Sequence, residues 1–351
     1  MNPLRTAIGA LVAIALSGIL AGCGKDDSPE PHASTTLNVL AWSEYIPQEV
    51  IDHYMDETQI QVTVDTVGSN EAMQAKLSAG AVKYDLIQPS EYFAEALVKT
   101  NRLAALEMAN IPNFTNIMPE YKDQPFDPGN KFTVPYMSGV VGIVYNAEKI
   151  KTPIKGFKDV FKPEHAGRII VVNDNREIVS WAMIVQGIPI NEMTPENLSK
   201  VRPMLQQWVK LIKKYDSDSP KTDLQQGNAD IGIVWNGEAA LVIANDKRFK
   251  FVVPEEGTHR YIDNLAIPND ALHKHAAEQF IDFCLRPEIS KSISDKWPYT
   301  NPNSKAREIL SPEQLANPAS YPALNNPETF RDIGKAGADV DKLMTEIRNG
   351  G

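Results

Sequence analysis

Short apolar runs alternate with helical patterns along most of this chain, and that alternation limits the possible folds more than any other feature. Apolar residues recur at helical spacing at Val50 and Tyr54 and over residues 198–212 and 340–347. Strands that alternate with such helices predict an α/β fold with mostly parallel sheets and helices on both faces. The predicted strands cover residues 37–41, 62–67, 85–87, 140–145, 168–172, 230–234, 251–253 and 265–267.

The length and composition fit two medium-sized lobes and exclude several kinds of partner. The chain has 351 residues, of which 42% are hydrophobic, enough for one large or two medium cores. Its formal charge is −10 and it has no dense basic run, so a nucleic acid is not expected as a partner. Its two cysteines are too few for a disulfide framework or a zinc cluster.

The N-terminal segment has the features of a secretion signal. Arg5 precedes an uncharged stretch over residues 7–22, which is shorter than the roughly 20 apolar residues that span a bilayer. We therefore predict a signal peptide over residues 1–22. The stretch runs into Leu-Ala-Gly-Cys, which resembles the lipobox of bacterial lipoproteins and implies cleavage before a lipidated Cys23. The alternative is an ordinary signal peptide followed by a chance cysteine.

The residues that follow this cysteine are polar. Residues 23–36 are predicted to be the lipidated cysteine and a flexible tether, with an ordered structure from near Leu37. The other cysteine, Cys284, lies in an apolar helical run over residues 280–285. We interpret it as a small core residue rather than a nucleophile.

Aromatic and polar residues cluster at the predicted strand ends, where ligands bind in open α/β sheets. Each has an ordinary explanation when taken alone: an aromatic side chain packs at a strand end, and Asp174 caps a helix that begins near Arg176. Their repetition favours one cleft with aromatic walls and as many as five carboxylates. The residues after strands are Trp42, Ser43, Glu44, Tyr45, Ser90, Tyr92, Asp174, Glu177, Trp235 and Glu238, and those just before the last predicted strand are Tyr261 and Asp263.

The chemistry of this cleft fits an organic cation better than a metal ion. The six histidines are dispersed, and the carboxylate-rich loop of a calcium site is missing. An aliphatic polyamine has ammonium groups separated by methylene spacers, so its site needs carboxylates at intervals with aromatic faces between them. The rings cover the methylenes and attract the ammonium groups, by about 0.5 to 2 kcal/mol for each contact. We expect no cofactor and no metal, and assign no catalytic residue.

The same positions resemble a known family, the extracytoplasmic spermidine/putrescine-binding proteins of polyamine ABC importers. The matching stretches include LNVLAWSEYIPQEVIDHYMDETQIQV, YDLIQPSEY, PFDPGNKFTVPYM, IVWNGEAA, IDNLAIP and FCLRPEIS. Together they cover nearly all of residues 37–348. The resemblance implies a periplasmic-binding-protein fold, in which two α/β lobes joined by crossing segments close over a linear polyamine. Lobe 1 would contain residues 37–141 and 264–312, and lobe 2 residues 142–263 and 313–351.

The resemblance also implies a role for each candidate residue. Ser43 and Ser90 would add hydroxyl or backbone acceptors, and Tyr299 matches a further family tyrosine at the cleft. The side chains that would sandwich the methylene chain are Trp42, Tyr45, Tyr92, Trp235 and Tyr261. The carboxylates that would receive ammonium groups are Glu44, Asp174, Glu177, Glu238 and Asp263.

Three departures from the family pattern bear on which polyamine is preferred. Glu238 stands where relatives that prefer spermidine carry a small hydroxyl residue and those that prefer putrescine an aspartate, which indicates the shorter diamine. Ser138 replaces a tryptophan that is common in relatives, and would enlarge or rehydrate the cleft. Phe330 or Arg331 falls where a spermidine-binding relative supplies an amide, and an arginine there would repel a third ammonium group.

We therefore expect a monomeric, lipid-anchored protein of the periplasm or cell surface that delivers a polyamine to an ABC permease with its ATPase. A lipoprotein that signals polyamine occupancy to a membrane receptor stays open as an alternative. A hydrolase that uses Asp174 and Glu177 as acid and base lacks an accompanying nucleophile, phosphate loop or metal set. Related architectures bind iron, thiamine, sugars or amino acids. An amino acid needs an arginine clamp, and we interpret Arg176 instead as a partner of its flanking acids.

Overall fold

The structure, a computed structural model, describes residues 36–324 and 327–350, which belong to one compact unit. The predicted signal peptide, the lipidated Cys23 and the tether through residue 35 lie outside the described residues. Thr36, predicted to end the tether, is the first residue of a strand. Among the described residues, each helix is too short or too polar to cross a bilayer.

The described strands form one nine-stranded sheet in the order β2-β1-β3-β9-β4-β7-β5-β6, and β8 pairs with β4 outside this path. Their bounds are β1 Thr36–Trp42, β2 Gln61–Val67, β3 Leu86–Ile87, β4 Thr133–Asn146, β5 Ile169–Val171, β6 Ile212–Tyr215, β7 Ile231–Trp235, β8 Phe249–Val252 and β9 Arg260–Ala266.

Parallel and antiparallel pairings occupy different parts of this sheet. Strand β1 is parallel to β2 and β3, and β5 is parallel to β6 and β7. Strand β9 is antiparallel to β3 and β4, and β4 is antiparallel to β7 and β8. The α/β class is confirmed, but mostly parallel pairing holds only toward the two ends of the sheet. The middle is antiparallel because the 14-residue strand β4 joins the two ends and runs against every strand it pairs with.

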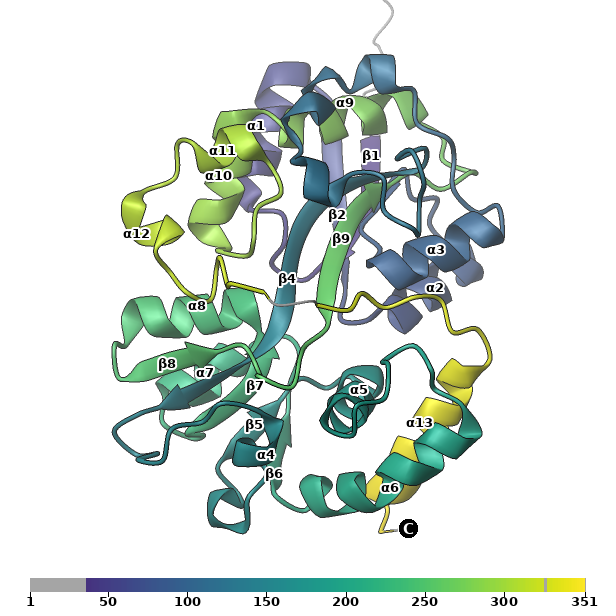
Figure 1. The fold of residues 1–351 in the computed structure, drawn as a ribbon. Coiled ribbons are helices and arrows are strands. Elements are labelled where there is room, and N and C mark those ends of the chain that lie inside the picture. Colours follow the sequence, from purple (N-terminus) through teal and green to yellow (C-terminus); the bar gives the residue numbers. More distant parts are fainter. Residues whose placement is uncertain (1–35, 325–326, 351) are drawn as a thin grey trace, which may run out of the picture. The chain divides into compact units, whose positions relative to one another are not determined.

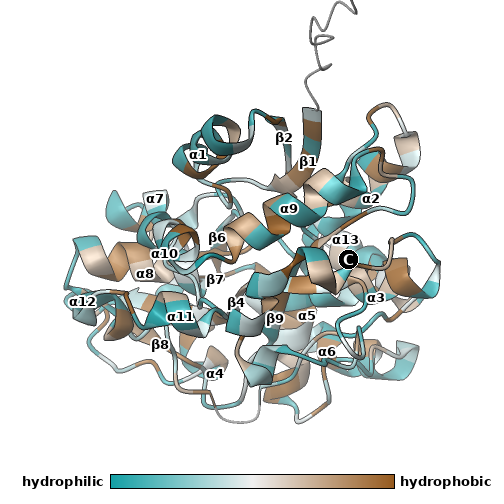
Figure 2. Ribbon diagram, turned by 90° about the horizontal axis from the view of Figure 1, so that it is seen from above, coloured by the Kyte–Doolittle hydropathy of each residue, from teal (hydrophilic) through white to brown (hydrophobic). Residues whose placement is uncertain are grey.

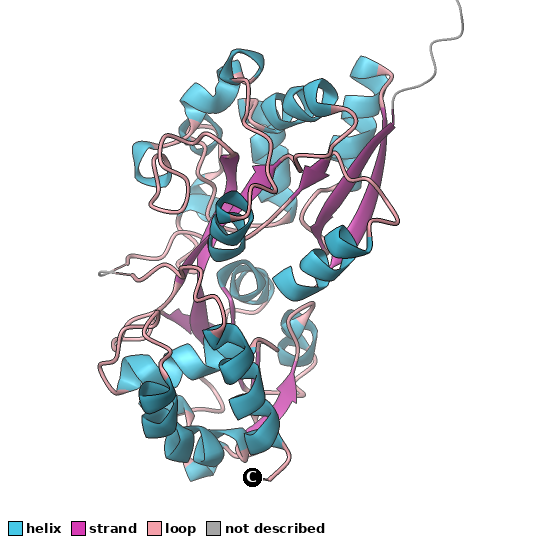
Figure 3. Cartoon of the chain, turned by 90° about the vertical axis from the view of Figure 1, so that its right-hand side faces the viewer, coloured by secondary structure: helices cyan, strands magenta, loops and turns pink. Residues whose placement is uncertain are grey.

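Helices flank the strands on both sides (Figure 3). The α-helices are α1 Gln48–Thr58, α2 Asn70–Ala79, α3 Glu91–Lys99, α4 Phe157–Val160, α5 Asn175–Val185, α6 Pro195–Val209, α7 Pro220–Gln225, α8 Asn236–Asn245, α9 Lys274–Cys284, α10 Pro287–Lys296, α11 Ser304–Arg307, α12 Pro312–Leu315 and α13 Ala336–Arg348. Short 3-10 helices cover Met108–Asn110, Pro112–Asn116, Pro119–Tyr121 and Pro163–His165.

Apolar side chains gather around two parts of the sheet. Helices α1 and α9 lie near β1 (Figure 1). They contribute to an aromatic cluster in which the rings of Tyr54 and Phe280 lie 4.9 Å apart. Near β5 and β7, α6 stacks Trp208 on Phe161 with ring centroids 4.1 Å apart. Strand β4 is buried along its whole length and contributes to both clusters.

Helix α9 shows why the sequence pattern was readable. Hydrophilic and hydrophobic residues alternate along it (Figure 2), and its apolar side faces the core. Cys284 is 2% exposed there, and burial raises the pKa of its thiol far above the usual range. An inert core thiol is what the sequence predicted.

Two details of the sequence prediction were wrong. The helical period over residues 198–212 is too long, because α6 ends at Val209 and Ile212 begins β6. That strand was missed because two adjacent lysines, Lys213 and Lys214, interrupt its apolar pattern. Tyr261 and Asp263 lie inside β9 rather than before it, since β9 begins at Arg260 and the polar residues interrupt its apolar pattern.

Candidate functional site

All thirteen candidate residues line one cavity of about 530 Å³. That volume lies within the usual range for small-molecule sites, roughly 300 to 1000 Å³. The residues come from the ends of β1, β5 and β7, the start of α3, the middle of β9 and the segment after α10. The structure thus brings together side chains that are far apart in the sequence, as the argument from strand ends predicted.

The turn after β1 carries two of the carboxylate and aromatic candidates. Glu44 has φ 60°, in the left-handed region that a residue with a side chain seldom adopts. The ring of Tyr45 lies 5.2 Å from that of Tyr299, and its hydroxyl donates to Asp263 Oδ2 at 3.0 Å. The hydroxyl of Tyr136 donates to the Tyr45 carbonyl at 2.9 Å and holds the turn in place.

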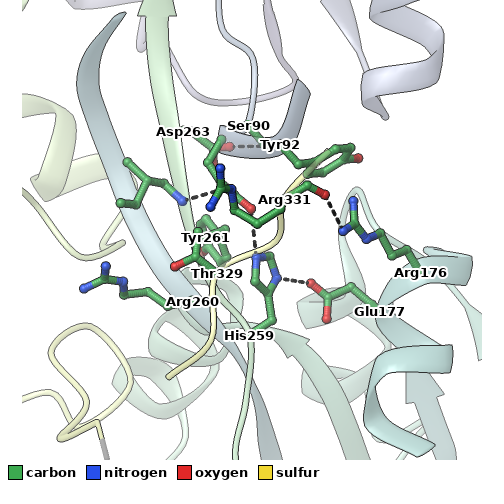
Figure 4. A network of polar contacts seen from close by, with 12 residues as sticks. Ser90, Tyr92, Arg176, Glu177, His259, Arg260, Tyr261, Asp263, Thr329 and Arg331 are labelled. Carbon is green, nitrogen blue, oxygen red and sulfur yellow. Dashed lines mark hydrogen bonds and ion pairs between the residues drawn. The ribbon is translucent and has the colours of Figure 1, made fainter. Parts of the chain in front are cut away.

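Asp263 projects into the cavity from β9. Ser90 Oγ donates to its Oδ1 at 2.7 Å, opposite the hydrogen bond from Tyr45 (Figure 4). Its side chain is buried, and burial raises the pKa of the carboxyl to about 7, although these two hydrogen bonds oppose the shift. In the described part of the chain, no Lys, Arg or His forms an ion pair with Asp263.

Asp174 caps helix α5, as the sequence predicted. Its Oδ1 accepts the backbone N–H of Glu177 at 3.0 Å. Burial and the neighbouring Glu177 raise the pKa of Asp174 to about 7. Like Asp263, it has no basic side chain as an ion-pair partner among the described residues.

Glu177 belongs to a buried ion-pair network that the sequence did not indicate. Its Oε1 lies 2.6 Å from His259 Nδ1, and the other ring nitrogen lies 2.9 Å from Glu91 Oε1 (Figure 4). All three side chains are at most 3% exposed. Burial lowers the pKa of His259, but the attraction of the two glutamates outweighs it and raises the pKa to about 9. The imidazolium therefore already neutralises Glu177.

Glu238 is also engaged by a basic side chain. Lys221 Nζ lies 3.0 and 3.1 Å from its two carboxylate oxygens and 3.1 Å from Glu44 Oε2. Burial raises the pKa of Glu238, opposed by the lysine. In this structure Glu44 and Glu238, which were predicted to receive ammonium groups of a ligand, share Lys221.

Arg176 does not pair with the acids that flank it, contrary to our interpretation. Its guanidinium lies over the rings of Tyr92, at 4.7 Å, and Phe330, at 4.0 Å. It donates to the Arg331 carbonyl at 2.7 Å and to Asn191 Oδ1 at 3.2 Å (Figure 4). Both hydrogen bonds come from Nη2, and the buried Nε has no hydrogen-bond partner in the described part of the chain.

The structure also shows where the other two departures from the family pattern lie, at Ser138 and at Phe330 or Arg331. Phe330 lines the cavity, whereas Arg331 makes a two-pronged ion pair with Glu95 at 2.7 and 3.0 Å and does not line it. Ser138 is buried in β4, where its hydroxyl donates to the Tyr261 carbonyl at 2.6 Å. Ser138 is not among the residues that line the cavity.

Acidic side chains dominate the cavity. It is lined by nine carboxylates against two arginines and one histidine. Residues 36–324 and 327–350 hold no group of three or more possible ligands that is close enough to bind a metal ion. The carboxylates are Glu44, Glu71, Asp174, Glu177, Asp218, Glu238, Asp263, Asp332 and Asp341.

A comparison with known protein families accounts for this architecture. The family model of the bacterial extracellular solute-binding proteins matches residues 49–325. The chain belongs to this family. A solute-binding protein needs a cavity that fits its solute and no catalytic machinery.

Several relatives of this solute-binding protein match it over most of their length. The spermidine/putrescine-binding periplasmic protein of Salmonella typhimurium is 32% identical over 329 residues, 91% of this chain and 94% of the relative. The putrescine-binding periplasmic protein of Escherichia coli K12 is 30% identical, covering 94% and 95%. The spermidine/putrescine ABC transporter substrate-binding protein of Streptococcus pneumoniae has a TM-score of 0.76 and 31% identity, covering 90% and 99%. These matches confirm the two-lobed fold.

Sequence reasoning missed four carboxylates that line the cavity of this solute-binding protein, Glu71, Asp218, Asp332 and Asp341. It also missed the ion-pairing residues Glu91, Lys221 and His259. Glu91 directly follows the candidate Ser90, and His259 lies two residues before Tyr261, so closeness in sequence to the candidates was one usable signal. Lys221 gave no such signal, because it lies in α7, far in sequence from the predicted strand ends.

Proposed function

We propose that this solute-binding protein captures a polyamine in the cavity, with putrescine ahead of spermidine, and delivers it to an ABC import permease with its ATPase. The thirteen candidate residues are the proposed binding site. The names of the Salmonella and Escherichia relatives, which specify spermidine and putrescine, support the ligand class. The acidic lining excludes an anionic solute, since nine carboxylates would repel it.

One observation carries the proposal: two of the five candidate carboxylates have no basic partner. Glu177 faces His259, and Glu238 and Glu44 share Lys221, whereas Asp174 and Asp263 form no ion pair with a described residue. A buried carboxylate without a cation is costly, and both respond with a raised pKa. Two open anionic positions match the two ammonium groups of a diamine.

Aromatic faces are available for the methylene chain. The rings of Trp235 and Tyr261 meet edge to face, 5.4 Å apart at 84°, and those of Tyr45 and Tyr299 pack at 5.2 Å. All four line the cavity. Such rings bury methylene groups while their faces attract an adjacent ammonium group.

Two lobes would close over the ligand, with boundaries near residues 141/142 and 263/264. The proposed lobes are residues 37–141 with 264–312 and residues 142–263 with 313–351. Their support is the pairing of β4, which pairs with β9 up to Val140 and with β7 from Val141 onward. Both proposed boundaries thus fall inside the two strands that cross from one part of the sheet to the other.

We further propose that Cys23 carries a lipid that anchors the protein in the periplasm or at the cell surface. The support is the Leu-Ala-Gly-Cys sequence that ends the uncharged N-terminal stretch. Mass spectrometry of the protein from membranes should find an acylated N-terminal cysteine. Cys23→Ser should release the protein from the membrane fraction, and retention of this variant would refute the anchor.

Calorimetric titration with putrescine, cadaverine, spermidine and spermine tests the main proposal. We expect saturable binding at one site per chain, tightest for putrescine. An absence of both heat and thermal stabilisation with all four amines would overturn it. Tight spermidine binding with weak putrescine binding would keep the ligand class and refute the preference.

A further inference from the structure

Lys221 holds its ammonium group between two carboxylates that line the cavity, Glu44 and Glu238, although Lys221 itself is not part of the lining. It lies in the first turn of α7, and its Nζ contacts both oxygens of Glu238 and one oxygen of Glu44. Its side chain is 16% exposed and that of Glu238 is 4% exposed, so this contact is largely shielded from water. Such a shielded contact is screened far less by salt than a surface ion pair.

An aromatic face completes the surroundings of this ammonium group. Nζ of Lys221 lies 5.6 Å from the ring centroid of Trp297, which lines the cavity. Burial lowers the pKa of Lys221, but Glu238 and Glu44 outweigh it and the pKa lies above its ordinary value. The lysine is therefore charged at every physiological pH. Two carboxylates and an indole around one ammonium are the surroundings that a polyamine nitrogen requires.

We propose that Lys221 is a specificity-determining residue: its tethered ammonium occupies Glu44 and Glu238 at the edge of the cavity and keeps the third ammonium of a triamine away from them. This inference rests on the proposed polyamine function and names the residue that discriminates between a diamine and a triamine. The preference for a diamine then comes from a cation of the protein itself, not from the length of the Glu238 side chain.

The charges at the site explain why a triamine is disfavoured. A diamine can place one ammonium at Asp263 and one at Asp174, neither of which has a basic partner. The third ammonium of spermidine finds Glu44 and Glu238 already sharing the ammonium of Lys221 and meets a like charge there. Binding would require displacement of the lysine from both glutamates, and the lysine would lose its partners in a shielded position.

Three variants of the intact protein test the role of the lysine. Lys221→Met keeps the length of the side chain and removes its charge, and Lys221→Arg keeps the charge. Lys149→Met is the matched control, since Lys149 Nζ forms a 2.8 Å ion pair with Asp230, a carboxylate that, unlike Glu44 and Glu238, does not line the cavity. Calorimetry gives the dissociation constants of each variant for putrescine and for spermidine, and thermal unfolding checks that each variant is folded.

We expect the ratio of the putrescine constant to the spermidine constant to rise at least tenfold in Lys221→Met. In Lys221→Arg and Lys149→Met it should stay within threefold of the wild-type value. An unchanged ratio in Lys221→Met, or an equal rise in Lys221→Arg, overturns the role of the charge while polyamine binding itself stands.

The wild-type protein gives a second test that does not depend on how well Lys221→Met folds. It should bind putrescine and cadaverine more tightly than spermidine. Tighter binding of spermidine by the wild-type protein overturns the exclusion. Failure of the wild-type protein to bind any of these amines overturns the proposed function as well, so the two failures are distinguishable.

Discussion

The imidazole of His259 lies flat against the ring of Phe330, with the ring centroids 3.7 Å apart and the planes at 21°. Both ring nitrogens of His259 contact carboxylates: Nδ1 lies 2.6 Å from Glu177 Oε1 and Nε2 lies 2.9 Å from Glu91 Oε1. The lining of the cavity therefore contains a buried cation that belongs to the protein. This cation fixes Glu177 before any ligand arrives and determines which carboxylates stay open.

Replacement of His259 should destabilise the fold strongly. His259→Gln leaves Glu91 and Glu177 buried without their cation, which costs about 3 to 5 kcal/mol when one partner of a buried pair is removed. Urea unfolding at pH 7 measures this loss. The control is His53→Gln, which alters an exposed histidine 4.0 Å from Glu57 and should change stability by less than about 0.5 kcal/mol.

The stability of the wild-type protein and that of His259→Gln should depend differently on pH. The pKa of His259 is raised from its ordinary 6.5 to about 9, so its stabilising contribution is complete below pH 6.5. That contribution is lost as the pH rises through 9. The stability gap between wild type and His259→Gln should therefore shrink between pH 6.5 and pH 9.5. A constant gap over this range would contradict a charged His259.

Polyamine binding should weaken in acid. Asp174 and Asp263 have a pKa of about 7 without ligand, and an ammonium group favours their ionised form. Binding near pH 7 should release protons, and below pH 7 each protonated carboxyl should cost up to about tenfold in affinity per pH unit. Calorimetry in two buffers of different ionisation enthalpy counts the protons. Equal heats in both buffers would refute this coupling.

Asp263→Asn separates binding from stability. It should weaken putrescine binding more than tenfold, because one ammonium loses its carboxylate. The substitution should also stabilise the ligand-free protein at pH 8. The folded protein raises the pKa of Asp263, so ionisation of this carboxyl above pH 3.8 destabilises the folded state, by about 1.4 kcal/mol for each unit by which the pKa is raised.

Thermal unfolding at pH 4 and pH 8 checks the stability part of this prediction. The gain should be present at pH 8 and small at pH 4, where the carboxyl is protonated in the folded state. Asp52→Asn, on the exposed side of α1, is the control and should change neither binding nor this pH dependence. Full affinity for putrescine in Asp263→Asn would remove Asp263 from the site.

Gly139 in β4 packs closely against the side chains of Asn236 and Tyr261, and Tyr261 lines the cavity. A Cβ at this position would overlap the side chains of Asn236 and Tyr261, whose hydroxyl donates to Asn236 Oδ1 at 2.6 Å. Gly139→Ala should therefore destabilise the fold by about 1 to 3 kcal/mol and weaken binding by displacing Tyr261. Gly337→Ala, in α13 with open space around it, should not destabilise the fold, and thermal unfolding compares the two variants.

The strand ends were readable from the sequence because local patterns determine them. Asp174 caps its helix through contacts within three residues, and Trp42 ends β1 directly after the apolar run of residues 39–41. The placement of these residues around one cavity could be predicted because ligands collect at such strand ends in α/β sheets.

Ion-pair partners were not readable, because they depend on contacts between distant segments. Glu177 and His259 are 82 positions apart, and Lys221 and Glu44 are 177 positions apart. A carboxylate that is free to bind a cation and one that is already neutralised look identical in sequence. Only the folded arrangement distinguishes Asp263 from Glu238.

Strand β4 has a consequence for how this protein unfolds. It is buried from end to end and supplies side chains to the apolar clusters on both parts of the sheet. Neither cluster can lose its structure while the other keeps an intact β4. Differential scanning calorimetry should therefore record one cooperative heat-absorption peak whose van't Hoff and calorimetric enthalpies agree, although the chain is long enough for two independently melting domains.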